Sequence, residues 1–119
     1  MELSFELPYP KKCSINSMYR WNAKGSILLS SHAKKYKETV YYMLRGFETF
    51  GDATLRVSIK MFPPDKRIRD VDNVLKVVID SMQYAKLFVN DSQIRSLSIE
   101  KFDEVKNGKL EINIKTMVY

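Results

Sequence analysis

The sequence contains one cysteine, Cys13, and one histidine, His32, among its 119 residues. A single cysteine excludes an intramolecular disulfide, and one residue of each kind excludes a zinc cluster of the Cys/His type or a site with paired histidines. The sequence also has no internal repeat, no low-complexity tract and no linker-like segment. Any metal ion that the chain binds must therefore be held by oxygen ligands.

A signal peptide is also missing from the pattern at the N-terminus. Residues 2–7 alternate polar and apolar side chains, whereas a signal peptide has a basic region followed by an apolar block. Hydrophobic residues make up 45% and charged residues 29%, as in soluble globular proteins and unlike membrane-spanning ones. We expect one domain over residues 1–119 with no membrane association, in the cytoplasm.

The charge of the chain favours a polyanionic partner. Lysine and arginine total 20 against 14 acidic residues, which gives a net charge of +6 and a pI near 9.4. Nucleic acid is the default polyanion, and such a charge argues against neutral metabolites, so we expect no small-molecule substrate. Solvated lysine faces on a small basic protein give the same balance, so charge alone does not decide between the two.

The hydrophobic pattern predicts an α+β domain of two helices packed on a mostly antiparallel four-stranded sheet. The expected elements are strands over 2–7, 53–62, 94–102 and 110–117, and helices over 31–47 and 72–84, with Ser30 or Ser31 as the first cap. Residues 106–109 are expected to form a hairpin turn between the last two strands. Between 11 and 30 no period persists, and we expect a long functional loop there.

The predicted loop 11–30 mixes basic and aromatic side chains, among them Arg20, Trp21 and Lys24. Such a mixture suits contacts with the backbone of a nucleic acid and stacking on unpaired bases. An aromatic residue in a loop equally often plugs the edge of a core. We expect Arg20 and Lys24 to contact nucleic acid.

The most informative stretch is the acidic pair Asp70 and Asp72, which lies among basic residues and is followed nineteen residues later by Asp91. Two aspartates so close together repel each other, and in an extended segment their side chains point the same way. Carboxylates with a nearby lysine, here Lys76, can hold Mg²⁺ and stabilise the charges of phosphodiester hydrolysis. A structural explanation is also available: Asp72 as a helix cap, Asp70 paired with a neighbouring arginine, and Asp91 in an Asx turn. The spacing leaves both explanations open.

A family resemblance favours the first explanation. Segment 62–76, which reads FPPDKRIRDVDNVLK, followed by Asp80, Leu87 and the pair Asn90-Asp91, resembles the RusA family of Holliday junction resolvases. The likeness extends to residues 7–10 near the start and to the two closing strands, so it covers nearly the whole chain. Two departures are Ile68, which interrupts a basic run, and Asn90, where relatives frequently carry a second aspartate.

The resemblance implies an endonuclease that cuts four-way DNA junctions by paired symmetric nicks during recombination and repair. It also implies a bacterial or phage-encoded protein that is associated with the nucleoid. Its implied cofactor is Mg²⁺, with Mn²⁺ as an alternative, and its implied form is a homodimer, because a junction offers two equivalent strands about a twofold axis. The implied metal ligands are Asp70, Asp72 and Asp91, the essential lysine is Lys76, and the implied DNA contacts are Lys66, Arg67, Arg69 and Asn73.

Two alternatives remain beside the resolvase. One is a non-catalytic protein that binds branched DNA and uses Asp70 and Asp72 only as caps. The other is a nuclease acting on other branched nucleic acids, because a cation and a water do not read the global shape of the substrate.

Overall fold

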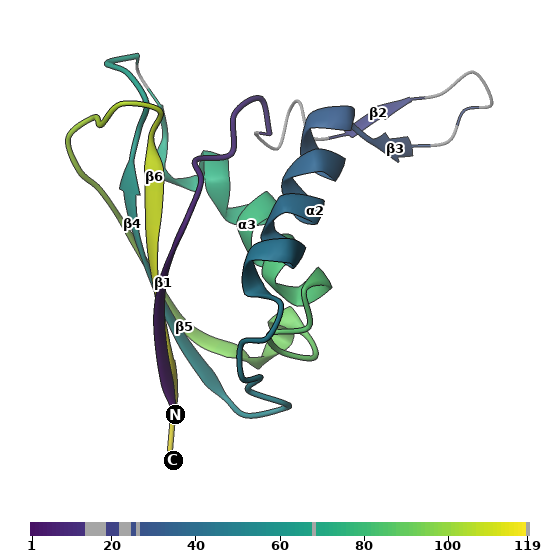
Figure 1. Cartoon of the computed structure of the whole chain (residues 1–119), viewed down its shortest axis with the longest axis vertical. Coiled ribbons are helices and arrows are strands. Elements are labelled where there is room, and N and C mark those ends of the chain that lie inside the picture. Colours follow the sequence, from purple (N-terminus) through teal and green to yellow (C-terminus); the bar gives the residue numbers. More distant parts are fainter. Residues whose placement is uncertain (14–18, 22–24, 26, 68, 119) are drawn as a thin grey trace.

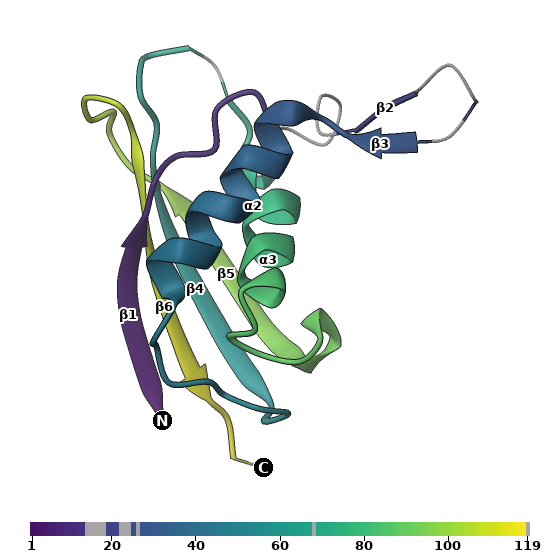
Figure 2. The same cartoon turned by 45° about the vertical axis from the view of Figure 1, so that its right-hand side comes forward.

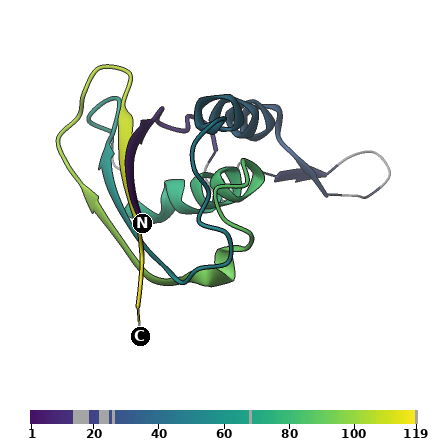
Figure 3. The same ribbon diagram turned by 60° about the horizontal axis from the view of Figure 1, so that its bottom comes forward.

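A four-stranded sheet carries two helices on one of its faces in the computed structural model (Figures 1 and 2). The structure describes residues 1–119 apart from 14–18, 22–24, 26, 68 and 119. The strands are β1 (Glu2–Leu7), β4 (Leu55–Phe62), β5 (Ile94–Lys101) and β6 (Lys109–Thr116), and the helices are α2 (Ser31–Leu44) and α3 (Leu75–Tyr84). Viewed from below, both helices lie on the same side of the sheet (Figure 3). The predicted α+β architecture is confirmed.

The core lies between the sheet and the helices because each element places its apolar side chains on one face. In β4, Leu55, Val57, Ile59 and Met61 are buried, while the side chains between them are exposed or half-buried. From the other layer, α2 buries Tyr36 and Val40, and α3 buries Val77, Val78 and Met82. This alternation of period two in strands and near four in helices is what made the elements predictable.

The strand order is β1-β6-β4-β5, which differs from the sequence prediction at its end. We expected the last two strands to form a hairpin through residues 106–109, but β4 lies between β5 and β6. β4 pairs parallel with β5 and antiparallel with β6. The prediction was wrong because an alternating pattern identifies a strand without identifying its neighbour. The chain instead crosses from β4 through α3 to β5, as a parallel pair requires.

Two further boundaries differ from the prediction. α2 ends at Leu44, three residues before Phe47, because Arg45 leaves the helical conformation and Gly46 has a φ of +86°. The expected loop 11–30 contains a small antiparallel pair, β2 (Tyr19–Trp21) and β3 (Ile27–Leu29), which projects away from the two layers (Figures 1 and 2). Ser30 caps α2 as predicted, because its hydroxyl oxygen accepts a hydrogen bond from the amide of Ala33.

The strand registers define the two ends of the sheet, where strands begin or finish, and we call these ends the upper edge and the lower edge. At the upper edge β1 ends at Leu7, β4 at Phe62 and β5 at Lys101, and β6 begins at Lys109. At the lower edge β4 and β5 begin, and both chain termini lie beyond it (Figure 1). No helix among the described residues is both long and apolar enough to cross a membrane.

Candidate active site

The acidic pair lies at the upper edge, in the connection from β4 to α3. Asp70 is the N-cap residue of a short 3-10 helix, η1 (Val71–Val74), and Asp72 lies in its first turn. The amide of Asn73 donates to the carbonyl oxygen of Asp70 at 3.2 Å, which closes this turn. The helix that we expected to begin at Asp72 therefore begins as a 3-10 turn, and α3 itself begins at Leu75.

The structural roles proposed for the aspartates belong to other residues. The N-cap residue of α3 is Val74, and neither it nor Asp70 makes a side-chain capping bond. Arg69 pairs with Asp65 rather than with Asp70, with Nη2 and Oδ2 3.1 Å apart. The side-chain turn before β5 is made by Asn90, whose Oδ1 accepts a hydrogen bond from the amide of Ser92 at 2.8 Å.

All three aspartates predicted as metal ligands are exposed. Among the described residues, no ion pair involves the carboxylate of Asp70, Asp72 or Asp91. A carboxylate that caps no helix and pairs with no cation contributes little to folding. These three side chains are therefore available to bind a cation from solution.

Lys76 is the second residue of α3, and its side chain points along the helix toward Asp80. Its Nζ is 3.2 Å from Oδ2 of Asp80, and the Lys76 side chain is 47% exposed. The hydrogen bond that Lys76 donates to Asp80 raises the pKa of Lys76, and the negative charges of Asp80 and Asp91 act in the same direction. We expected Lys76 and Asp72 to reach one phosphate together. The side chain of Lys76 extends toward Asp80 and remains an ammonium ion, and the shared phosphate stays a prediction.

Asp91 lies at the lower edge, at the start of a second 3-10 helix, η2 (Asp91–Gln93). Its amide donates to Oε1 of Gln83, near the C-terminal end of α3, at 3.0 Å. Gln93 joins the same turn to the start of β4, because its Nε2 donates to the carbonyl oxygens of Gly51 and Ala53. The position of Asp91 is thus set by α3 and by the segment between α2 and β4.

Two elements separate Asp91 from the acidic pair within one chain. α3 has ten residues and is about 15 Å long. β5 has eight residues and spans roughly 23 Å, and Nζ of Lys101 at its far end donates to the carbonyl oxygen of Arg69. No group of three or more His, Cys, Asp or Glu side chains among the described residues is arranged to hold a metal ion. The three ligands are not brought together in a single chain.

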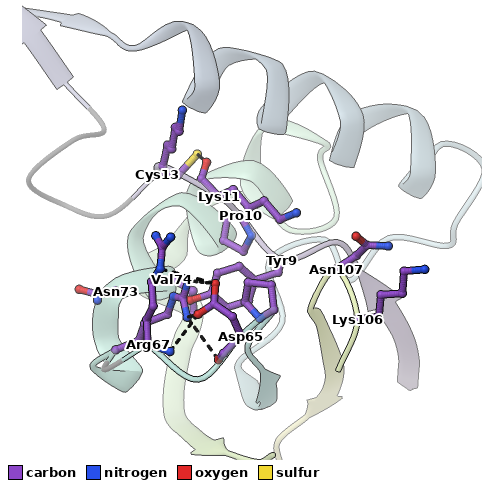
Figure 4. Close-up of a pocket in the computed structure, with 13 residues that line it drawn as sticks. Tyr9, Pro10, Lys11, Cys13, Asp65, Arg67, Asn73, Val74, Lys106 and Asn107 are labelled. Carbon is purple, nitrogen blue, oxygen red and sulfur yellow. Dashed lines mark hydrogen bonds and ion pairs between the residues drawn. The ribbon is translucent and has the colours of Figure 1, made fainter. Parts of the chain in front are cut away.

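Of the residues predicted to contact DNA, Arg67, Arg69 and Asn73 line a pocket of about 540 Å³ at the upper edge (Figure 4). Lys66 is exposed outside this pocket, 3.8 Å from Glu104. Arg20 lies in β2, but its side chain is not among those described, and Lys24 lies outside the described residues.

The pocket also contains cations that the motif analysis did not assign, namely Lys11, Lys12 and Lys106. Lys106 had no signal of its own, because it lies in a turn that we expected to close a hairpin. Only the sheet order, which places the start of β6 beside the end of β4, brings this turn next to the acidic motif.

Comparison with known proteins agrees with the motif. The family described as Endodeoxyribonuclease RusA matches residues 8–115. The chain is 33% identical to the crossover junction endodeoxyribonuclease rusA of Enterobacteria phage HK97, covering 95% of this chain and 93% of that protein. It is 31% identical to the enzyme of the same name from Enterobacteria phage 82, covering 93% and 92%, and 30% identical to that of Shigella sonnei, covering 96% and 94%. The chain belongs to the RusA family of endodeoxyribonucleases.

Proposed function

We propose that this protein is a Mg²⁺-dependent endodeoxyribonuclease that resolves four-way DNA junctions by paired symmetric nicks, acting as a homodimer. The observation that carries the proposal is the availability of Asp70, Asp72 and Asp91, which are exposed and form no ion pair among the described residues. Family membership and a net charge of +6 support a DNA substrate.

The donor set fits a hard divalent cation in its chemistry. Carboxylate oxygens are the ligands that Mg²⁺ and Mn²⁺ take in proteins, and Asp70 and Asp72 offer them from one short turn. When bound, the ion would lower the pKa of a water molecule and neutralise charge on the phosphoryl oxygens. Asp70, Asp72 and Asp91 would hold it.

Lys76 supplies the positive charge that hydrolysis needs beside the carboxylates. Its pKa is raised by the hydrogen bond that it donates to Asp80, so it stays protonated at neutral pH. An ammonium near the scissile phosphate stabilises the charge that develops on the leaving oxygen. Asp80 fixes the direction of Lys76 and is a positioning residue.

A twofold dimer can bring Asp91 close to Asp70 and Asp72, which a single chain does not do. A metal ligand lies about 2.1 Å from Mg²⁺, so residues at opposite ends of α3 cannot share one ion within this chain. In a C2 dimer the same surface faces itself in reverse, so the upper end of one α3 can meet the lower end of the other. We infer that each site combines Asp70 and Asp72 of one subunit with Asp91 of the partner subunit. Two such sites would account for two symmetric nicks.

The test uses a labelled four-way junction and a matched linear duplex, incubated with the protein in Mg²⁺ or in EDTA. We expect the wild type to nick two opposing strands of the junction in Mg²⁺ only. Asp72→Asn should abolish nicking while keeping or tightening junction binding, because it removes negative charge near a phosphate. Glu38→Gln, which removes one charge from an exposed position on α2, should nick like the wild type.

The alternatives give different results in the same assay. A junction that is bound in Mg²⁺ but never nicked would favour the non-catalytic branched-DNA-binding protein. Equal nicking of flaps or RNA branches would favour the broader nuclease. Full activity of Asp72→Asn would overturn the ligand assignment.

A further inference from the structure

The pocket at the upper edge is built from three chain segments, and its lining does not include Asp70, Asp72 or Asp91 (Figure 4). These are residues 9–13 after β1, residues 64–74 after β4, and the turn that contains Lys106 and Asn107 before β6. Its lining includes five cationic residues and one carboxylate, that of Asp65. A cavity of this charge is suited to an anionic ligand.

Asp65 does not repel such a ligand, because its carboxylate is already engaged. It accepts hydrogen bonds from Nη2 of Arg69 at 3.1 Å and from the amide of Arg67 at 2.9 Å. The side chain of Arg69 is only 18% exposed, and its guanidinium lies 5.7 Å from the ring centre of Tyr9. Tyr9 is itself 8% exposed. Arg69 is therefore held in place before any ligand arrives.

Other cations of the pocket keep their charge available. Among the described residues, no carboxylate pairs with Lys11 or Lys106, and both side chains are exposed. They lie on different segments of the rim, one after β1 and one before β6. A phosphate that binds here can gain charge-assisted contacts without breaking an existing pair.

The pocket is larger than a phosphate group requires, and part of its lining is apolar. Its volume of about 540 Å³ lies within the range of sites that enclose whole small molecules. Pro10, Pro64 and Val74 add apolar surface to the lining. Flat apolar surface next to fixed cations suits a base attached to its phosphate, and a base can enter only when it has left the stack.

We propose that this pocket binds one unstacked nucleotide of a DNA strand, with its phosphate at the cationic rim and its base against the proline walls. The inference deepens the proposed function, on which it rests, because the centre of a branched substrate can supply a nucleotide that is not stacked in a duplex. It would give the enzyme a contact that a continuous duplex does not offer.

The test measures binding of the tetranucleotide dT4 in EDTA by NMR titration, so no cleavage is needed. We expect shifts at the amides of Asn73, Lys106 and Asn107. Lys106→Ala should weaken dT4 binding about 3-fold or more, through loss of a phosphate contact. Lys115→Ala removes the same charge at the opposite end of β6 and should have a smaller effect. An abasic tetramer with the same phosphates should bind about 5-fold or more weakly than dT4, because the base contact is lost.

Each contrary result overturns the proposal. Equal affinity for dT4 and the abasic tetramer would make the pocket a phosphate site only. Equal losses in the two lysine variants would reduce binding to net charge, and shifts confined to residues outside the pocket would exclude it. Glu38→Gln, the exposed control on α2, should bind dT4 like the wild type. If dT4 fills the pocket but the wild type never nicks a junction in Mg²⁺, the proposed function fails and the nucleotide site stands.

Discussion

Aspartates that lie a few residues apart in this chain have different environments. Asp65 is bound by Arg69 and by the amide of Arg67, and its pKa is lowered to about 2, mainly by the hydrogen bond from Arg69. Asp70 and Asp72, in the next turn, have no ion-pair partner among the described residues. The sequence spacing of aspartates and cations does not decide which carboxylate is paired, because Lys76 lies four residues after Asp72 but pairs with Asp80.

Acid should reveal the contribution of Asp65 to stability. Its pKa in the folded chain, about 2, lies below the ordinary value of 3.8, so its stabilising effect is present above pH 4 and is lost as the pH falls toward 2. Urea unfolding at pH 5 and pH 2.5 should show a smaller drop in midpoint for Asp65→Asn than for the wild type. Asp103→Asn, an exposed aspartate on the β5–β6 connection, should drop like the wild type. The same drop in all three proteins would mean that Asp65 does not stabilise the fold.

At the scale of elements, the β5–β6 connection is held against the upper edge at Gly108. This glycine has a φ of +67°, and a Cβ there would lie 2.7 Å from Cβ of Tyr9 and 3.0 Å from the nitrogen of Pro64. Only glycine allows the turn to pack so closely. This close packing also places Lys106 and Asn107 of the same turn in the lining of the pocket at the upper edge.

Two glycine variants separate crowding from backbone strain. Gly46→Ala, at a φ of +86° with nothing within 4 Å, should cost only the left-handed backbone penalty of about 1 to 2 kcal/mol. Gly108→Ala adds overpacking of about 1 to 3 kcal/mol, so its total should reach about 2 to 5 kcal/mol. Chemical denaturation measures the free energy of unfolding of both variants. Because each variant replaces one glycine by alanine, the effect on the unfolded chain is the same in the two and cancels in their comparison. Equal losses would show that the turn can move away from Tyr9.

The elements themselves were largely predictable from the sequence, because each buries one periodic face. The four main strands and both helices lie where their apolar patterns predict them. Examples are the alternation from Leu55 to Met61 in β4 and the helical spacing from Val74 to Met82. The pairing of β5 with β4 was not predictable, since it depends on where α3 returns the chain. The short pair β2–β3 has three residues in each strand, too few to produce a period.

The candidate site divides in the same way. The local part, Asp70, Asp72 and Lys76, could be read from spacing, because one turn and one helix connect these residues. The position of Asp91 could not, because nineteen residues of separation fit either a return to the acidic pair or a run along α3 to its far end. Oε1 of Gln83 accepts a hydrogen bond from the amide of Asp91, and this bond holds Asp91 at the far end of α3. Likewise, Lys106 enters the pocket only through the sheet order.

At the scale of the whole molecule, the separation of Asp91 from the acidic pair raises the question of whether each site is formed by one subunit or by two. We expect Asp72→Asn and Asp91→Asn homodimers each to be inactive. If each site takes its acidic pair from one subunit and Asp91 from the other, a mixed dimer has one site with both defects and one site with none. If each site lies within one chain, a mixed dimer has one defect in each site.

Mixing the two variants therefore distinguishes the arrangements. Equal amounts, unfolded together and refolded, should give mixed dimers as half of the population, each with one intact site, and hence roughly a quarter of the wild-type nicking rate. These dimers should nick one strand of a junction and release few resolved products. Refolded wild type gives the reference rate, and a mixture of Asp70→Asn with Asp72→Asn should stay inactive, because the acidic pair of every site then carries one of the two substitutions. Continued inactivity of the Asp72→Asn and Asp91→Asn mixture would require Asp91 to move about the length of α3 to join its own acidic pair, because no other arrangement of two chains leaves every site defective.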